Sequence, residues 1–213
     1  GAIQVTNGAA SDLTGSGANY TATIEPTTDG DVTVEVPGES ASDEAGNSNE
    51  VSNTLTINYD ATAPTVELTT EAVSPTNSAF DVSITFSEEV SGLTLEDFEV
   101  TNASISELTG SGGTYQIVVA PSQSGQVLVA LPANSTLDHA NNGNEASNQL
   151  EIEFDNTALT VDLSTTASSP TNNSFEVAIS FSDAVADFVA TDLTTTNGTV
   201  SDFSGGGASY VAT

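Results

Sequence analysis

The sequence of 213 residues contains no lysine and no arginine, although it carries 30 aspartate and glutamate residues. A typical globular chain is about a quarter charged with both signs mixed, so this absence reflects selection or a strong genomic bias. Without basic side chains nothing can neutralise phosphates, which argues against nucleic acid and anionic membranes as partners. The formal charge of −30 favours cations as partners, and an acidic, heavily solvated surface suited to saline water explains it equally well.

Cysteine is also absent, so no disulfide can stabilise the chain. Without lysine, Lys–Asn and Lys–Asp cross-links are impossible too, and we expect the core and bound ions to hold the fold. No apolar run approaches the ~20 residues of a membrane-spanning helix, and no signal peptide is present. The sequence therefore predicts no membrane insertion within these residues.

Groups suited to catalysis are scarce. The single histidine, His139, has Glu44 as its counterpart in the internal repeat described below, and nucleophilic catalysis needs a base held near a nucleophile. Carboxylate pairs serve glycosidases, but they carry no information in a chain with acidic residues throughout. The Gly-rich stretches GSGANY, GSGGTY and GGGASY are interpreted as hairpin turns, because no lysine follows and no helix begins. We therefore predict that the chain is not an enzyme.

The chain does contain a repeat of 95 residues without a gap: DATAPTVELTTEAVSPTNSAFDVSITFSEEV begins at Asp60 and DNTALTVDLSTTASSPTNNSFEVAISFSDAV at Asp155. A fixed period held without insertions marks an array of like modules, and about 100 residues suffice for a module with its own core. We assign residues 1–60 to the C-terminal part of one repeat, 61–155 to a complete repeat and 156–213 to the N-terminal part of another. The chain is interpreted as a window from a longer array.

The partial repeats leave one alternative open, in which the two ends complete each other between chains. They make a poor complement, because both contain the segment that matches residues 96–118. This overlap favours the longer array.

Apolar residues alternate with polar ones within the complete repeat, as in FDVSITF at 80–86. Alternation over about four to eight residues predicts strands with one buried face, and no segment of useful length has helical spacing. Turn sequences such as SPTN at 74–77 and PSQSG at 121–125 separate the runs. The predicted strands are 65–70, 79–87, 97–102, 104–109, 114–120, 126–131 and 147–155.

This strand pattern predicts an all-β fold of tandem immunoglobulin-like β-sandwich modules with about seven strands each. A closed barrel of similar strand count is the alternative. The residues expected to be buried are Phe80, Val82, Ile84, Phe86, Tyr115, Ile117, Val129 and Ile152.

The motifs APTVEL, SPTN, VSITFSEEV, LEDFEVTN, LTGSGGTY and LEIEFD resemble the bacterial Ig-like repeats of very large cell-surface adhesins. DEAGNSNEVSN at 43–53 is similar to the Asp-x-Ala-Gly-Asn-x-Asn loop of that family. The resemblance covers the whole chain and implies secretion, tandem arrays and often bound calcium, as in biofilm adhesins, surface filaments and the adhesins of gliding bacteria. Asn141 in place of Gly46, and Leu159 in place of Pro64, depart from the other copy where a junction site would lie.

The strand directions predict that three acidic segments meet at one end of the complete repeat. If successive strands alternate in direction, the linker with Asp60, the loop with Glu88 and Asp97 and the loop with Asp138 share that end. Calcium takes about six to eight oxygen ligands, so we expect these carboxylates to form a calcium site at the junction.

The equivalent set at the second junction is Asp155, Asp183 and Asp192. The same residues also have an explanation without an ion. DATAP is consistent with an Asx turn before a rigid proline, and DEAGN with a plain turn.

We predict a stalk or spacer module of a secreted bacterial cell-surface adhesin or extracellular filament. Its partners would be neighbouring repeats and other filament or cell-surface components. The alternatives are a module that binds carbohydrate or an ice or mineral surface, and an accessory domain of a large secreted enzyme. A binding site needs exposed aromatics or a flat repeated surface, and this sequence has no tryptophan and few aromatics outside core positions, which favours the stalk.

Overall fold

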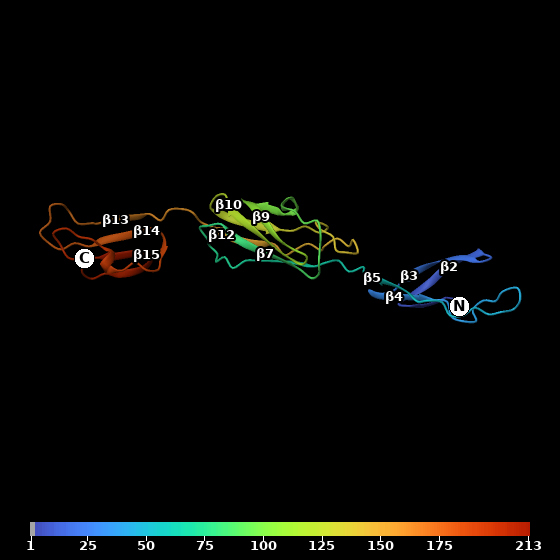
Figure 1. The fold of residues 1–213 in the computed structure, drawn as a ribbon. Helices are drawn as coiled ribbons and strands as arrows, with labels where there is room; N and C mark the ends of the chain where they lie inside the picture. The colour runs from blue at the N-terminus through green and yellow to red at the C-terminus, as the bar shows by residue number, and fades with distance from the viewer. Residues whose placement is uncertain (1–2) are drawn as a thin grey trace. The chain divides into compact units, whose positions relative to one another are not determined.

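The computed structural model describes residues 3–213, which form β-strands and two short 3-10 turns and contain no α-helix. The chain through Asp155 makes one compact unit and Asn156–Thr213 makes a second, and each is described by itself (Figure 1). The predicted all-β class is confirmed.

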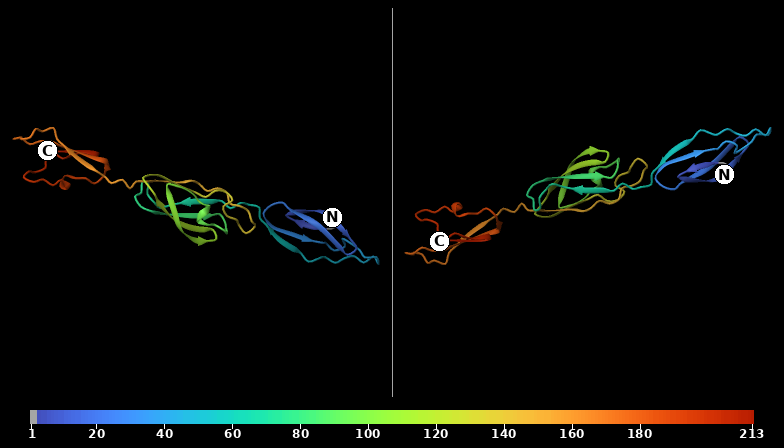
Figure 2. Two further views of the ribbon diagram at one scale, coloured as in Figure 1. Left: turned by 90° about the horizontal axis from the view of Figure 1, so that it is seen from above. Right: turned by 90° about the horizontal axis from the view of Figure 1, so that it is seen from below.

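The complete repeat contains the seven strands that its alternation predicts: β6 (Val66–Thr69), β7 (Phe80–Phe86), β8 (Glu99–Thr101), β9 (Ala103–Ser111), β10 (Thr114–Pro121), β11 (Gly125–Ala130) and β12 (Leu150–Phe154). They form a four-stranded sheet in the order β6-β7-β10-β9 and a three-stranded sheet in the order β12-β11-β8. All neighbouring strands are antiparallel. The two sheets are the layers of a sandwich rather than a closed barrel (Figure 2).

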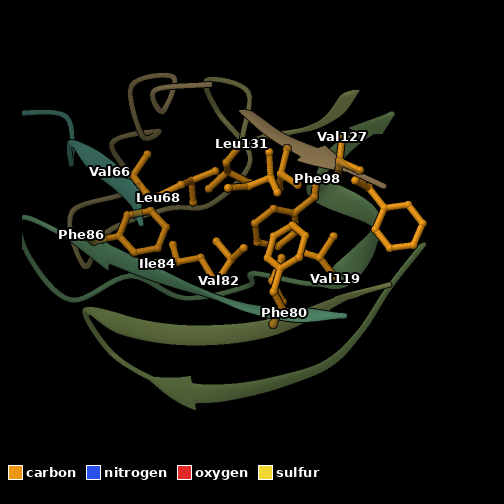
Figure 3. Close-up of a cluster of buried hydrophobic side chains, with 14 of the residues drawn as sticks. Val66, Leu68, Phe80, Val82, Ile84, Phe86, Phe98, Val119, Val127 and Leu131 are labelled. Carbon is orange, nitrogen blue, oxygen red and sulfur yellow. The ribbon is translucent and has the colours of Figure 1, made fainter. Parts of the chain in front are cut away.

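The core of this repeat lies between the two sheets. Figure 3 shows Val82 and Ile84 of β7 pointing across the interior toward Leu131, with Val127 of β11 at the other end of the core. Each side chain of this kind, once fully buried, stabilises the fold by about 1.5–3 kcal/mol. The buried apolar residues are Val66, Leu68, Phe80, Val82, Ile84, Phe86, Val90, Phe98, Ile117, Val119, Val127, Val129, Leu131, Ile152 and Phe154.

Seven of the eight residues predicted to be buried are in this set, and Tyr115 is only partly buried. The ring of Tyr115 packs edge-on against Phe86 with the ring centroids 6.1 Å apart. Its hydroxyl donates a hydrogen bond to the carbonyl oxygen of Val90 at 3.2 Å. The polar end of the side chain therefore stays near the surface while the ring extends the core.

The first partial repeat contains a sheet of β1 (Gln4–Thr6), β4 (Gly30–Glu35) and β5 (Leu55–Tyr59), in the order β1-β4-β5, and a hairpin of β2 (Gly8–Ser16) and β3 (Asn19–Pro26). At an offset of 95 residues, the sheet is the counterpart of β8, β11 and β12. The hairpin is the counterpart of β9 and β10.

The second unit contains one sheet in the order β13-β14-β15, made of β13 (Val161–Ser164), β14 (Val177–Val185) and β15 (Ser204–Ala212). It is the counterpart of β6-β7-β10, because Ile179 pairs with Tyr210 as Ile84 pairs with Tyr115. The aromatic rings of this unit gather around Phe188, whose centroid lies 4.9 Å from that of Phe181.

Candidate metal site

The loop between β11 and β12 is held in shape by two asparagines. The carboxylate of Asp138 accepts hydrogen bonds from the backbone N–H and the side-chain amide of Asn142, both at 2.8 Å. The buried Asn144 accepts a hydrogen bond from the N–H of Thr136 at 2.9 Å and donates to two backbone carbonyls of the same loop. These bonds fix the buried carboxylate of Asp138 at the end of the sandwich.

The first partial repeat forms the same loop from the same motif. Asp43 accepts hydrogen bonds from the backbone N–H and side-chain amide of Asn47 at 2.8 and 2.9 Å. Gly46 has a φ of 89°, and its replacement Asn141 has a φ of 72°. Asparagine tolerates this left-handed region better than other residues with a side chain, so the departure of Asn141 from the family pattern leaves the loop intact.

Asp60, Glu88 and Asp138 come together at this end of the complete repeat, and we call them the acidic triad. One carboxylate oxygen from each lies within 4.8 Å of the others. Asp60 follows β5, Glu88 follows β7, and Asp138 is in the β11–β12 loop. The side chain of Asn142 donates to the carbonyl oxygen of Asp60 at 3.3 Å, so the linker is also tied to the loop.

The acidic triad contains negative charge, and no lysine or arginine can balance it, because the chain has neither residue. Burial, followed by the charges of Asp60, Asp138 and Asp29, raises the pKa of Glu88. Burial also acts to raise the pKa of Asp138, but hydrogen bonds from Asn142 and the neighbouring backbone N–H groups outweigh it and hold that pKa below its ordinary value. Asp138 is therefore kept ionised, while ionising Glu88 costs free energy.

The acidic triad has the dimensions of a divalent cation site. Calcium binds oxygens at about 2.3–2.6 Å, so two oxygens on one ion lie at most about 5 Å apart, and the 4.8 Å spread of the triad fits this limit. All of these candidate ligands are oxygens, which suit hard cations rather than transition metals. Each oxygen of Asp138 that accepts a bond from Asn142 retains capacity for a second contact. The triad could thus hold a metal ion.

Asp97 was predicted to join this group, and the structure places its carboxylate in another role. The residue ends a 3-10 turn, η1 (Leu95–Asp97). Its carboxylate accepts hydrogen bonds from the backbone N–H and hydroxyl of Thr94 at 2.7 and 2.8 Å. Asp192 does the same in η2 (Ala190–Asp192), where its carboxylate accepts from the N–H of Val189 at 2.9 Å. Both side chains close short turns.

The two other residues predicted for the second junction, Asp155 and Asp183, belong to different units. Asp155, in the first unit, accepts a hydrogen bond from the hydroxyl of Ser124 at 3.4 Å. Asp183, in the second unit, is exposed near the end of β14.

Asp29 is a residue of the site that the sequence did not single out. It lies in the turn before β4, and its carboxylate accepts hydrogen bonds from the hydroxyl of Thr62 and from the N–H of Ala61. The Thr62 hydroxyl, followed by the Ala61 N–H, lowers the pKa of Asp29. Its counterpart in the complete repeat is Ser124. The available signal for Asp29 was its place in the turn sequence TTDGD, which follows the β2–β3 hairpin. The replacement of Asp29 by Ser124 in the other copy concealed this signal.

Comparison with known proteins identifies one family. The model of the bacterial Ig-like domain matches residues 60–154 and again residues 155–213, and no catalytic family was found. No curated protein and no solved structure matches the chain significantly. In the part of the chain that the structure describes, no helix has the length and apolar character needed to cross a membrane.

Proposed function

Because this chain belongs to the bacterial Ig-like domain family, we propose that it is a stalk or spacer segment of an extended adhesin or filament on a bacterial surface. The observation that carries this proposal is the complete repeat itself, which buries a continuous core between its own two sheets. A module that is stable by itself can be copied in tandem to gain reach. Its nine-residue strand β9 spans about 30 Å at ~3.3 Å per residue.

The same proposal assigns a calcium ion to the acidic triad. Asp60 would provide a ligand from the linker, while Glu88 and Asp138 would provide ligands from the module, so one ion would join the two. Its charge would offset the burial and, after it, the neighbouring negative charges that raise the pKa of Glu88. Calcium suits ligands from three irregular segments better than magnesium, which requires near-octahedral geometry. The ion would stiffen the joint between repeats.

Calcium should therefore raise the melting temperature of the complete repeat. Free calcium at about 100 times its Kd stabilises a folded protein by about 2.7 kcal/mol. For a module of this size, 1 kcal/mol raises Tm by about 4–8 °C, so we expect a shift of roughly 10–20 °C between calcium and chelator. Glu88→Gln should remove most of this shift. The matched control is Asp183→Asn, which removes the equivalent exposed carboxylate one repeat later and should leave the shift unchanged.

Equal melting temperatures in calcium and in chelator would exclude calcium as a structural ion and leave the stalk proposal standing. The stalk is tested separately, by inserting a second copy of residues 61–155 into the chain and measuring small-angle scattering. The maximum dimension should increase by at least about 30 Å, the span of one strand. A longer chain with an unchanged maximum dimension would mean that the repeats fold back on one another, and it would contradict a spacer role.

A further inference from the structure

The first and last strands of the complete repeat are tied to each other although they belong to different sheets. β6 is an edge of the four-stranded sheet, and β12 is an edge of the three-stranded sheet. Just before β12, the side chain of Asn148 accepts a hydrogen bond from the N–H of Leu68 at 2.8 Å and donates one to its carbonyl oxygen at 3.0 Å. The backbone of β6 is thus bound to the segment that leads into β12.

A second tie joins the same two stretches of chain further along. The N–H of Thr76 donates to the carbonyl oxygen of Glu153 at 2.9 Å, and the N–H of Asp155 donates to the carbonyl oxygen of Thr76 at 2.9 Å. The N–H of Glu153 also donates to the hydroxyl of Ser74 at 3.0 Å. We call both ties together the terminal clamp. It consists of Leu68, Ser74 and Thr76 on one segment and of Asn148, Glu153 and Asp155 on the other.

The two segments of the terminal clamp run in the same direction. Leu68 meets Asn148, and later in both segments Thr76 forms a parallel bridge with Phe154. The chain enters the repeat at Asp60, in the acidic triad beyond the end of β7, and β6 starts beside that end of β7. It leaves the repeat after β12, at the opposite end of the sandwich.

Tension along the chain therefore pulls the two segments past each other. The first segment is pulled toward the acidic triad, and the second is pulled away from it. Because the segments are parallel neighbours, the hydrogen bonds of both ties resist this sliding together. If the end strands were antiparallel neighbours, the chain would enter and leave at one end, and their bonds would open one after another. The observed arrangement is the one that slows forced unfolding, which is governed by the unfolding rate.

The groups that form the terminal clamp recur in the other copies. The sequence SPTN at 74–77 recurs at 169–172, and the position of Asn148 is asparagine in the first copy as well. Glu153 is replaced by Asn58 in that copy, but the clamp uses only its backbone N–H and carbonyl. The repeat thus keeps the side chains that the clamp needs and varies one that it does not need.

We propose that the terminal clamp is the element that carries tension through the complete repeat, so that the repeat resists mechanical unfolding as well as providing length. This inference deepens the proposed stalk function and rests on it, because a stalk between a surface and an attached object transmits tension. The terminal clamp contains no residue of the acidic triad, so it acts without an ion.

Single-molecule force spectroscopy in chelator tests the proposal with two pulling directions. The chain has no cysteine, so thiol attachment points exist only where they are introduced. Ala61→Cys with Ala158→Cys, at exposed residues on either side of the repeat, loads the terminal clamp along its segments. Gln123→Cys with Ala158→Cys instead separates the paired ends of β11 and β12, at Gly125 and Phe154, one bond at a time. At equal force, the first geometry should unfold at least about tenfold more slowly, because several hydrogen bonds must break together.

Two variants test the ties separately in the first geometry. Ser74→Ala removes the acceptor of one hydrogen bond and should accelerate forced unfolding by about threefold to tenfold. Asn148→Ala removes both bonds to the buried Leu68 and should accelerate it by at least about tenfold. The geometry that separates β11 from β12 should show a smaller acceleration for both variants, because the terminal clamp is not loaded along its segments there.

The matched control is Asn144→Ala, which removes hydrogen bonds within the β11–β12 loop and none of the terminal clamp. It lowers stability without force, but the loop is still formed when the terminal clamp breaks, so this loss should hardly appear in the forced unfolding rate. Both clamp variants should therefore be accelerated more than the control for the same loss of stability without force. An acceleration no greater than that of the control would make the clamp an ordinary structural contact and overturn the proposal.

Equal unfolding rates in the two pulling directions would also overturn the proposal, because the resistance would then not depend on sliding of the terminal segments. Neither result would change the dimension of a longer chain in scattering, which measures how the repeats follow one another rather than how they unfold. Failure of the terminal clamp and failure of the stalk proposal are therefore distinguishable.

Discussion

The substitution Leu68→Ala should destabilise the complete repeat strongly, while Leu163→Ala, its counterpart one repeat later, should have almost no effect. The two positions have similar neighbours in sequence, in VELT at 66–69 and VDLS at 161–164, and the same place on an edge strand that pairs with the next strand of its sheet. They differ in burial, because Leu68 is packed between two sheets and Leu163 lies on an open face.

The magnitude follows from the burial of Leu68. Replacing a buried leucine with alanine removes its transfer free energy and leaves a cavity, at a cost of about 2.7–5 kcal/mol. A surface substitution changes stability by no more than about 0.5 kcal/mol. At about 3 kcal/mol, Leu68→Ala should accelerate exchange of the slowest amides of the complete repeat by more than 100-fold, because every ~1.4 kcal/mol is a factor of ten.

Hydrogen exchange with mass spectrometry measures this effect locally, since peptides covering β7 and β10 report only on the complete repeat. Leu163→Ala should leave exchange in β7 and β10 unchanged and alter exchange in β14 only slightly. If Leu163→Ala destabilised its sheet as much as Leu68→Ala destabilises the sandwich, Leu163 would be buried in the monomer and the open-face description would be wrong.

Two further predictions concern the acidic end and its loop. In chelator, stability should increase as pH falls from neutral to about 4.5, because folding raises the pKa of Glu88 and its protonation removes a buried charge and its repulsion. Below about 3.8, stability should decrease again, because folding lowers the pKa values of Asp138 and Asp29. Glu88→Gln should abolish the increase, and thermal melts that show stability falling steadily from pH 7 in the wild type would contradict this assignment. Asn144→Ala should lower the local stability measured by hydrogen exchange at β11 by at least about 2 kcal/mol, because it leaves buried backbone groups unpaired. Asn49→Ala, at the more exposed equivalent position in the first repeat, should lower stability less. Equal losses of stability would argue against burial as the cause.

Strand positions could be predicted because one face of every strand in the complete repeat is buried, which leaves a period-two pattern in the sequence. The start of the last strand, β12, could not be predicted from this pattern. Residues 147–149 extend the alternation, but Ser147 donates its N–H to Leu131 at 2.9 Å and Asn148 binds Leu68. The N–H of Ser147 and the side chain of Asn148 are therefore engaged in contacts outside the β11–β12 ladder, so β12 begins only at Leu150.

The alternating pattern alone does not predict burial in the partial repeats. Val161 and Leu163 have the same alternating pattern as Val66 and Leu68, yet they are exposed. The pattern records which face of a strand is apolar, but burial also requires a second sheet to cover that face. Residues 156–213 match only 61–118, so these residues include no counterparts of β11 and β12 to cover the apolar face of β13 and β14.

The meeting of Asp60, Glu88 and Asp138 follows from strand direction alone, which is why it was predictable from the sequence. The role of Asp97 could not be predicted, because a three-residue 3-10 turn gives no periodic signal in the sequence. This turn directs the carboxylate of Asp97 to Thr94. Direction places a residue at one end of a sandwich, while local hydrogen bonds decide where its side chain points.

The two copies of the asparagine-braced loop separate the role of the loop from the role of the acidic triad. Asp43 and Asp138 bind their asparagines in the same way, and both have a lowered pKa, so the loop alone suffices to hold an ionised carboxylate. Within residues 3–213, a cluster of three carboxylates arises where Asp60 and Glu88 are added from the linker and from the segment after β7. Cation binding is therefore expected to be a property of the junction. It can change from copy to copy through single substitutions, such as the Asp183 that stands at the position of Glu88 one repeat later, while the loop and the sandwich remain the same.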